Sequence, residues 1–266
     1  MTTAARAWRG LARAPLAAYT LAAYAFLFFP SVVIIIFSFN DSKVTVWPPR
    51  GFTLHWYADI WRDPTLVESI VNSLLVASCA TIGAVILGTM GAIAVSRYYF
   101  RGRGVVNAAM LAPIALPGLV TGIAMLSYFQ YVGIQRSLLT VIIAHIVFTL
   151  PFVVTIVAAR LSDFDVAVEE AALDLGASPL RSFLTVTLPI IAPSVAGAAL
   201  IVFALSFDEF IITFFVIGPQ STLPLKIWSM MRLGIVPTIN AVASIIIVLS
   251  TLLVLVSARF VRVAGR

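Results

Sequence analysis

Residues Ser182–Phe207 read SFLTVTLPIIAPSVAGAALIVFALSF, a run of 26 residues without a single charged side chain. A helix needs about 20 predominantly apolar residues to cross the roughly 30 Å hydrocarbon core of a bilayer. The run therefore predicts a membrane-spanning helix, and it decides the fold class of the chain.

Five further charge-free runs occur along the chain, between 23 and 32 residues long. Each can hold one spanning helix and none can hold two. They are Ala14–Asn40, Ser69–Ser96, Gly104–Gln135, Ser137–Ala159 and Leu233–Ala258. We predict an all-α polytopic membrane protein in which residues 1–266 form one transmembrane domain, with six transmembrane helices at residues 16–38, 70–95, 105–128, 138–159, 190–213 and 239–260.

The composition excludes several other classes of protein. Of the 266 residues, 61% are hydrophobic and 11% are charged, whereas a soluble domain has about 45–50% and about 25%. A disordered chain and an ordinary cytosolic enzyme are therefore excluded. Cys79 is the single cysteine, and the two histidines are far apart, so we expect neither a disulfide within the chain nor a metal site. We expect His145, inside the fourth span, to be a hydrogen-bonded packing residue.

Basic residues indicate which side of the membrane each connection faces. The N-terminal tail, the second connection, the fourth connection and the C-terminal tail hold eleven Lys and Arg residues together, and the opposite connections hold six. Cytoplasmic segments carry the excess of Lys and Arg. Both termini are therefore predicted to be cytoplasmic, with residues 1–13 as a cytoplasmic tail. The first apolar run is too long for a secretory signal, so we expect it to be retained.

Local features predict distortion and close packing within the spans. Pro113 and Pro117 each remove a helical hydrogen bond, so kinks are expected in the third span. Ala80, Ala84 and Gly88 form part of a stripe of small residues at i, i+4 spacing, which lets another helix approach closely. Packing within the chain is the simpler explanation of that stripe, and a dimer face is the alternative.

The longest cytoplasmic connection, residues 160–189, is predicted to form two short helices. Ser162 or Asp163 can cap the first helix, and Gly176 can end it in a left-handed conformation. Ser178 can cap the second, with a proline in its first turn, and Pro189 then marks the beginning of the fifth span.

The first of these short helices is unusually acidic. Asp165 and Glu169 are one turn apart, as are Glu170 and Asp174, and such like-charge pairs destabilise an isolated helix slightly. The opposite face is apolar. An acidic helix suits an anionic lipid surface poorly, so we expect it to dock on a protein partner.

The same connection resembles a known sequence motif. Glu170-Ala171-Ala172, then Gly176, then Val186-x-Leu188-Pro189 resemble the EAA motif of bacterial ABC importer permeases, although that family has isoleucine where this chain has Val186. Further strings, among them Ser206-Phe-Asp-Glu-Phe210 and Thr222-Leu-Pro-Leu-Lys-Ile-Trp228, are similar to permeases of the spermidine/putrescine type.

The resemblance implies a type I ABC importer permease in the bacterial inner membrane. Residues 160–189 would be its coupling loop, which seats on a separate ATPase subunit. The implied partners are two ATP-binding subunits, a second and similar permease, and an extracytoplasmic solute-binding protein. A polyamine is the implied solute; an amino-acid-like solute, a phosphonate, thiamine or a metal stays open. The implied coupling residues are Glu169, Glu170, Ala171, Ala172, Asp174, Gly176, Leu188 and Pro189.

The chain itself holds no recognisable catalytic machinery. It has no GxxxxGK[ST] phosphate loop, so ATP and Mg²⁺ are expected to be used by the partner ATPase, and nothing indicates nucleic-acid binding. An ion-coupled secondary transporter is one alternative, but that class needs buried ionisable residues at mid-span, and apart from His145 the spans have none there. An intramembrane enzyme is another, but no catalytic constellation is visible.

Asp208 and Glu209 are adjacent acids near the outer end of the fifth span. Ionisable groups at such depth are costly and tend to face a pathway, so two carboxylates could contact a cationic solute. The alternatives are a pair that only ends the helix, or a contact to the binding protein.

Overall fold

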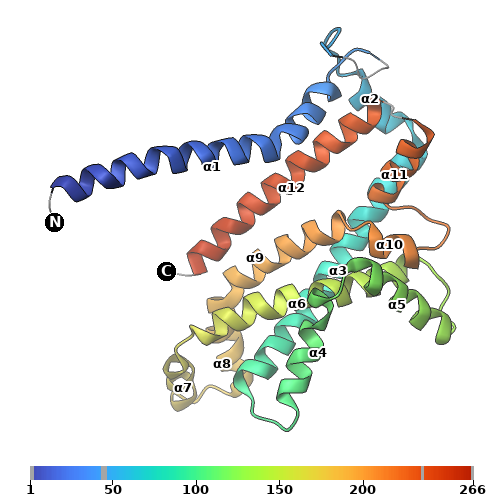
Figure 1. The fold of residues 1–266 in the computed structure, drawn as a ribbon. Helices are drawn as coiled ribbons and strands as arrows, with labels where there is room; N and C mark the ends of the chain where they lie inside the picture. The colour runs from blue at the N-terminus through green and yellow to red at the C-terminus, as the bar shows by residue number, and fades with distance from the viewer. Residues whose placement is uncertain (1–2, 43–46, 235–236, 265–266) are drawn as a thin grey trace. The chain divides into compact units, whose positions relative to one another are not determined.

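The computed structural model describes residues 3–42, 47–234 and 237–264, and these residues form twelve α-helices (Figure 1). The predicted tail 1–13 lies mostly inside the first helix, with residues 1–2 outside the described part. The helices are α1 (Thr3–Ser38), α2 (His55–Arg62), α3 (Pro64–Arg97), α4 (Arg103–Ala115), α5 (Gly118–Tyr131), α6 (Leu138–Ser162), α7 (Val166–Asp174), α8 (Pro179–Ser182), α9 (Leu188–Phe207), α10 (Ile211–Val216), α11 (Leu223–Leu233) and α12 (Pro237–Ala264).

Among the described residues, five continuous helical segments are long and apolar enough to cross a membrane. A sixth span exists only if α4 and α5 are counted together, and these two helices meet at an angle of 114°. The spanning segments are Pro15–Ser38, Pro64–Arg97, Leu138–Ser162, Pro179–Phe207 and Pro237–Ala258.

The prediction of one kinked helix at 105–128 is therefore wrong. The helix breaks at Leu116, whose backbone is extended (φ −93°, ψ 134°) and whose N–H donates to the carbonyl of Pro113. A residue before proline is driven out of the helical region, and Pro117 has no N–H to continue the ladder. The two prolines together thus produce a sharp corner, where one alone would kink the helix.

The fifth predicted span, 190–213, also needs correction. Its helix α9 ends at Phe207, residues 208–210 form a break, and α10 begins at Ile211. The physical reason lies at Glu209, whose carboxylate accepts a hydrogen bond from the N–H of Ile212 at 2.9 Å. A side chain that bonds an N–H in the first turn of a new helix in this way competes with continuation of the old one.

The second span begins earlier than predicted because it has a strong cap. Asp63 Oδ1 accepts hydrogen bonds from the N–H groups of Thr65 and Leu66 at 2.9 and 3.2 Å, and Pro64 occupies the first position of α3. The Thr65 hydroxyl, which also donates to this carboxylate, lowers the pKa of Asp63 below its ordinary value. The cap therefore stays ionised near neutral pH.

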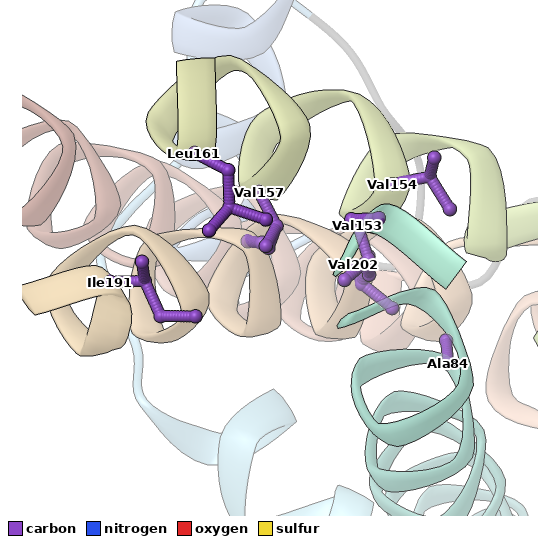
Figure 2. Close-up of a cluster of buried hydrophobic side chains, with 9 residues drawn as sticks. Ala84, Val153, Val154, Val157, Leu161, Ile191 and Val202 are labelled. Atoms are coloured by element: carbon purple, nitrogen blue, oxygen red, sulfur yellow. The ribbon is translucent and has the colours of Figure 1, made fainter. Parts of the chain in front are cut away.

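Residues 63–229 and 249–264 belong to one compact unit, and its core lies between α3, α6 and α9. Figure 2 shows the cluster, in which Ala84 of α3 faces the valines of α6, and Ile191 and Val202 project from α9. The small-residue stripe of α3 is packed inside the chain: a Cβ on Gly88 would lie 2.7 Å from Cβ of Val153. This confirms the simpler explanation of the stripe.

The other unit contains the described residues up to Arg62 and residues from Met230 to Val248. In this unit, hydrogen bonds join α2 to the end of α1 and to α12. The indole N–H of Trp56 donates to the carbonyl of Asn40 at 2.9 Å. The hydroxyl of Tyr57 is hydrogen-bonded to the hydroxyls of Ser38 and Ser244, at 2.7 and 2.9 Å. In contrast, none of the most apolar stretch of α1 is buried.

Candidate functional site

The acidic connection begins with a capped helix. Asp165 Oδ1 accepts a hydrogen bond from the N–H of Ala167 at 3.0 Å and so caps α7. The prediction of Ser162 or Asp163 as the cap is wrong, because α6 continues through Ser162, whose hydroxyl instead donates to the carbonyl of Ala159 at 2.7 Å. Glu169 lies in the first turn of α7, where the helix dipole favours a negative charge.

α7 ends in a backbone turn at the glycine of the motif. Leu175 N–H donates to the carbonyl of Ala171 at 3.1 Å, and Ala177 N–H donates to that of Ala172 at 3.1 Å. These bonds close the helix around Gly176, whose φ of +87° is in the left-handed region predicted for it. The glycine of the motif therefore has a local structural reason, because it allows α7 to end at this turn.

Beyond this turn the chain runs without a gap into the fifth span. Ser178 Oγ accepts from the N–H of Arg181 at 3.4 Å and begins α8, as predicted. However, the helical path does not stop between α8 and Pro189. A π-helical turn at Phe183–Thr187, in which Leu188 N–H donates to the carbonyl of Phe183, joins it to α9. Because Pro189 lacks an N–H, the helical hydrogen-bond ladder is interrupted here, and the single π-turn lies directly before this interruption.

Arg97, at the end of α3, contacts the acidic helix α7 and the residue Phe164 just before it. Its guanidinium carbon lies 4.7 Å from the ring centroid of Phe164, and its Nη2 lies 3.4 Å from Oε2 of Glu169. That Nη2 has no hydrogen-bond partner, so the contact to Glu169 is an ion pair without hydrogen-bond geometry. The sequence analysis used Arg97 only as one of the basic residues that indicate the cytoplasmic side, and so missed this contact. Its position as the first charged residue after a span is the feature that could have indicated it.

A cavity of about 630 Å³ lies beneath α7 and separates it in part from α3. Charged groups and apolar side chains both line it: Met90, Arg97, Tyr98, Glu169, Leu173 and Phe183 are among them. Arg97 of α3 and Glu169 of α7, the two members of the ion pair, both line this cavity.

The predicted coupling residues divide into two groups. Glu169 is half-buried and faces Arg97, whereas Glu170 and Asp174 are exposed. Leu188 and Pro189 lie in the first turn of α9, after the π-turn, and so belong to the membrane-spanning helix. Exposure does not follow this division: Ala171, Gly176 and Pro189 are exposed, and Ala172 and Leu188 are half-buried.

The two outer acids also have different surroundings. Asp208 is exposed, and its Oδ2 accepts a hydrogen bond from the hydroxyl of Ser250 on α12 at 3.1 Å. Glu209 is half-buried, and its carboxylate accepts a hydrogen bond from the N–H of Ile212 in the first turn of α10. Beside them, the rings of Phe210 and Phe214 lie 5.5 and 5.7 Å from that of Trp228. Asp208 is the carboxylate that a solute could reach.

His145 is fully buried in α6 and bonded at both ring nitrogens, which confirms the expectation of a hydrogen-bonded packing residue. Its partners are the hydroxyls of Ser206 and Thr213, at 2.8 and 2.9 Å. These two residues stand on either side of the break that carries Asp208 and Glu209.

The chain is similar to inner-membrane subunits of transport systems. Residues 81–265 match the family described as binding-protein-dependent transport system inner membrane component. The putrescine transport system permease protein PotI of Escherichia coli K12 is 38% identical over 236 residues, which is 85% of this chain and 83% of PotI. The spermidine/putrescine transport system permease protein PotC of the same strain is 38% identical over 241 residues, which is 90% of each chain.

Solved structures agree on the fold. A chain of the bacterial ABC transporter that imports the acidic polysaccharide alginate matches with a TM-score of 0.68 at 16% identity, covering 97% of this chain and 98% of that one. A chain of the inward-facing MetNI methionine ABC transporter matches with a TM-score of 0.64 at 19% identity, covering 79% and 99%. The chain therefore belongs to the family of binding-protein-dependent transport system inner membrane components, as a non-catalytic, multi-pass permease subunit.

Proposed function

We propose that this chain is a permease subunit of an ATP-driven importer of polyamines, with putrescine or spermidine as the solute. The observation that carries the solute class is the 38% identity, over at least 83% of either chain, to permeases named for putrescine and for spermidine/putrescine. The exposed carboxylate of Asp208 supports a cationic solute. An ammonium group that loses water in the pathway would be attracted to this negative charge.

Coupling to ATP hydrolysis is assigned to α7. Its exposed acids Glu170 and Asp174 would contact a cytoplasmic ATP-binding subunit, one of two in the transporter, and that subunit would hold the ATP and Mg²⁺. Glu169 would transmit the movement, because it is paired with Arg97 at the end of α3. Ala171, Ala172 and Gly176 set the end of the helix, and Leu188 and Pro189 continue the connection into the fifth span.

The complete transporter would include two further proteins. A second, similar permease would supply the other half of the pathway. An extracytoplasmic binding protein would deliver the solute to the outer side, where Asp208 and Glu209 lie.

The decisive experiment is uptake by the assembled transporter. The chain is co-expressed with the ATPase, second permease and binding protein from its genomic neighbourhood, and the complex is reconstituted into liposomes. We expect uptake of radiolabelled putrescine only with ATP, and binding-protein-stimulated ATP hydrolysis. Transport of an amino acid, a phosphonate, thiamine or a metal ion instead would replace the proposed solute. Uptake driven by an ion gradient without ATP would favour a secondary transporter.

Charge variants of the two acidic sites test the assigned roles separately. Glu170→Lys is expected to abolish stimulated ATP hydrolysis, because it places a cation in the acidic contact surface. Asp208→Asn combined with Glu209→Gln is expected to reduce putrescine uptake while ATP hydrolysis persists. Unchanged uptake in the second variant would remove these carboxylates from the pathway.

A further inference from the structure

His145 connects three segments of the chain by side-chain hydrogen bonds. The residue lies on α6 and is 1% exposed. Its Nδ1 lies 2.8 Å from the hydroxyl of Ser206, in the last turn of α9, and its Nε2 lies 2.9 Å from the hydroxyl of Thr213, on α10. The imidazole therefore bridges the two helices that the break at 208–210 interrupts.

The hydrogen positions in this cluster follow from counting donors. Thr213 has one hydroxyl hydrogen, and it is donated to the carbonyl of Glu209 at 2.9 Å. Towards His145 the Thr213 oxygen can then only accept, so Nε2 carries a hydrogen. In a neutral imidazole Nδ1 is then an acceptor, and the Ser206 hydroxyl donates to it. Every polar group in this arrangement is satisfied without placing a charge inside the protein.

The resulting chain of bonds ends on the backbone of the outer acids. It runs from Ser206 to His145, to Thr213, and to the carbonyl of Glu209. The carboxylate of Glu209 is fixed independently by the N–H of Ile212. Backbone bonds hold the first and last residues of the break, because Asp208 N–H donates to the carbonyl of Ala204 and Phe210 accepts from Phe214 N–H. The carbonyl and the side chain of the middle residue, Glu209, are held by Thr213 and Ile212.

We propose that His145 is a positioning residue for transport: as the neutral Nε2–H form, it holds the α9–α10 break and thereby directs the carboxylates of Asp208 and Glu209. The inference rests on the proposed role of those carboxylates in the pathway. His145 itself does not contact the solute; it acts through Thr213 and the Glu209 carbonyl.

Isosteric variants separate this role from simple packing. Thr213→Val keeps the shape of the side chain but removes the link between His145 and Glu209, and His145→Leu removes the imidazole. The matched control is Thr149→Val. Like Thr213, Thr149 is fully buried and its hydroxyl donates to the carbonyl four residues earlier, here that of His145. Unlike Thr213, its hydroxyl makes no further side-chain bond. His145→Gln should restore function in part, since an amide can donate to Thr213 and accept from Ser206.

Uptake of radiolabelled putrescine by the full transporter is the first measurement. We expect His145→Leu and Thr213→Val to lower the maximal rate about tenfold, as for loss of a buried hydrogen-bonded group. The half-saturating concentration should not change, because the binding protein captures the solute. His145→Gln should recover more than half of the lost rate, and Thr149→Val should stay within about twofold of the parent protein.

A local measurement tests positioning without any transport. In a Cys79→Ser background, Asp208→Cys is labelled with a nitroxide and its mobility is followed by electron paramagnetic resonance in the assembled complex. We expect a more mobile spectrum when Thr213→Val or His145→Leu is added, and an unchanged spectrum with Thr149→Val. If His145→Leu fails to assemble, Thr213→Val alone decides the outcome.

The two measurements distinguish failure of this inference from failure of the proposed solute contact. If the spectrum and the uptake rate are unchanged in Thr213→Val, the positioning role is overturned. If the spectrum changes as expected, but Asp208→Asn with Glu209→Gln retains full uptake, the positioning of the break stands and its proposed use in the solute pathway is overturned.

Discussion

At the scale of single residues, Arg97 joins the acidic helix to the second span. Its guanidinium lies over the ring of Phe164 and beside the carboxylate of Glu169. A cation–π contact and a half-exposed ion pair are together worth about 1–2 kcal/mol. We expect Arg97→Ala to lower putrescine uptake about five- to tenfold while ATP hydrolysis continues, because a movement of α7 would no longer reach α3. Uptake and hydrolysis measured on the same proteoliposomes give the number of solute molecules moved per ATP hydrolysed.

The control for Arg97 is a nearby arginine with no such contact. Arg101 is exposed on the following turn, so Arg101→Ala should change neither rate by more than about twofold. An Arg97→Ala transporter with a normal ratio of solute moved to ATP hydrolysed would contradict the proposed connection.

At the scale of elements, the end of α7 can be tested through its glycine. Gly176 has a φ of +87° and no atom near its missing side chain, so Gly176→Ala meets only the backbone cost of about 1–2 kcal/mol for a left-handed residue. Gly133, at φ +75° after α5, is equally open and is the matched control. Both alanine variants should lower the thermal midpoint of the purified complex by a similar amount, but only Gly176→Ala should impair stimulated ATP hydrolysis.

Close packing of α3 against α6 gives a second prediction for elements. Gly88→Ala brings a new Cβ to 2.7 Å from Cβ of Val153, so the helices must separate, at a cost of about 1–3 kcal/mol. Gly104, in the first turn of α4, has nothing within 4 Å, and Gly104→Ala should be neutral. Thermal unfolding in detergent compares them, and equal midpoints for the two variants would contradict this account of the stripe.

Elements were predictable where a local pattern decides them. The long charge-free runs indicate spans, and Gly176 indicates a helix end, because hydrophobic length and backbone sterics act within a few residues. The 114° corner at Leu116 was not predictable as a corner, since each proline alone permits a kinked but continuous helix. The role of Arg97 depends on Phe164 and Glu169, more than 60 positions away, and a periodic pattern contains no such information.

At the scale of the whole molecule, the distribution of basic residues predicts cytoplasmic termini. In a Cys79→Ser background, Gln135→Cys on the outer side should react with a membrane-impermeant maleimide in spheroplasts, because that side chain is exposed. Tyr99→Cys, at a position where the tyrosine is 92% exposed, should react only after the membrane is opened. The reverse pattern of labelling would invert the topology.

The unbroken helical segment from Pro179 to Phe207 has a mechanical consequence. Its 29 residues correspond to about 43 Å at 1.5 Å per residue. It begins just after the turn at Gly176 and ends at the break at 208–210. Near its middle it packs against α3 and α6. Such a segment behaves as a lever with a central fulcrum: a rotation of about 10° carries its two ends by about 4 Å in opposite directions. Closing the cytoplasmic end would then open the outer one, so a single stiff helix supplies the reciprocity that alternating access requires.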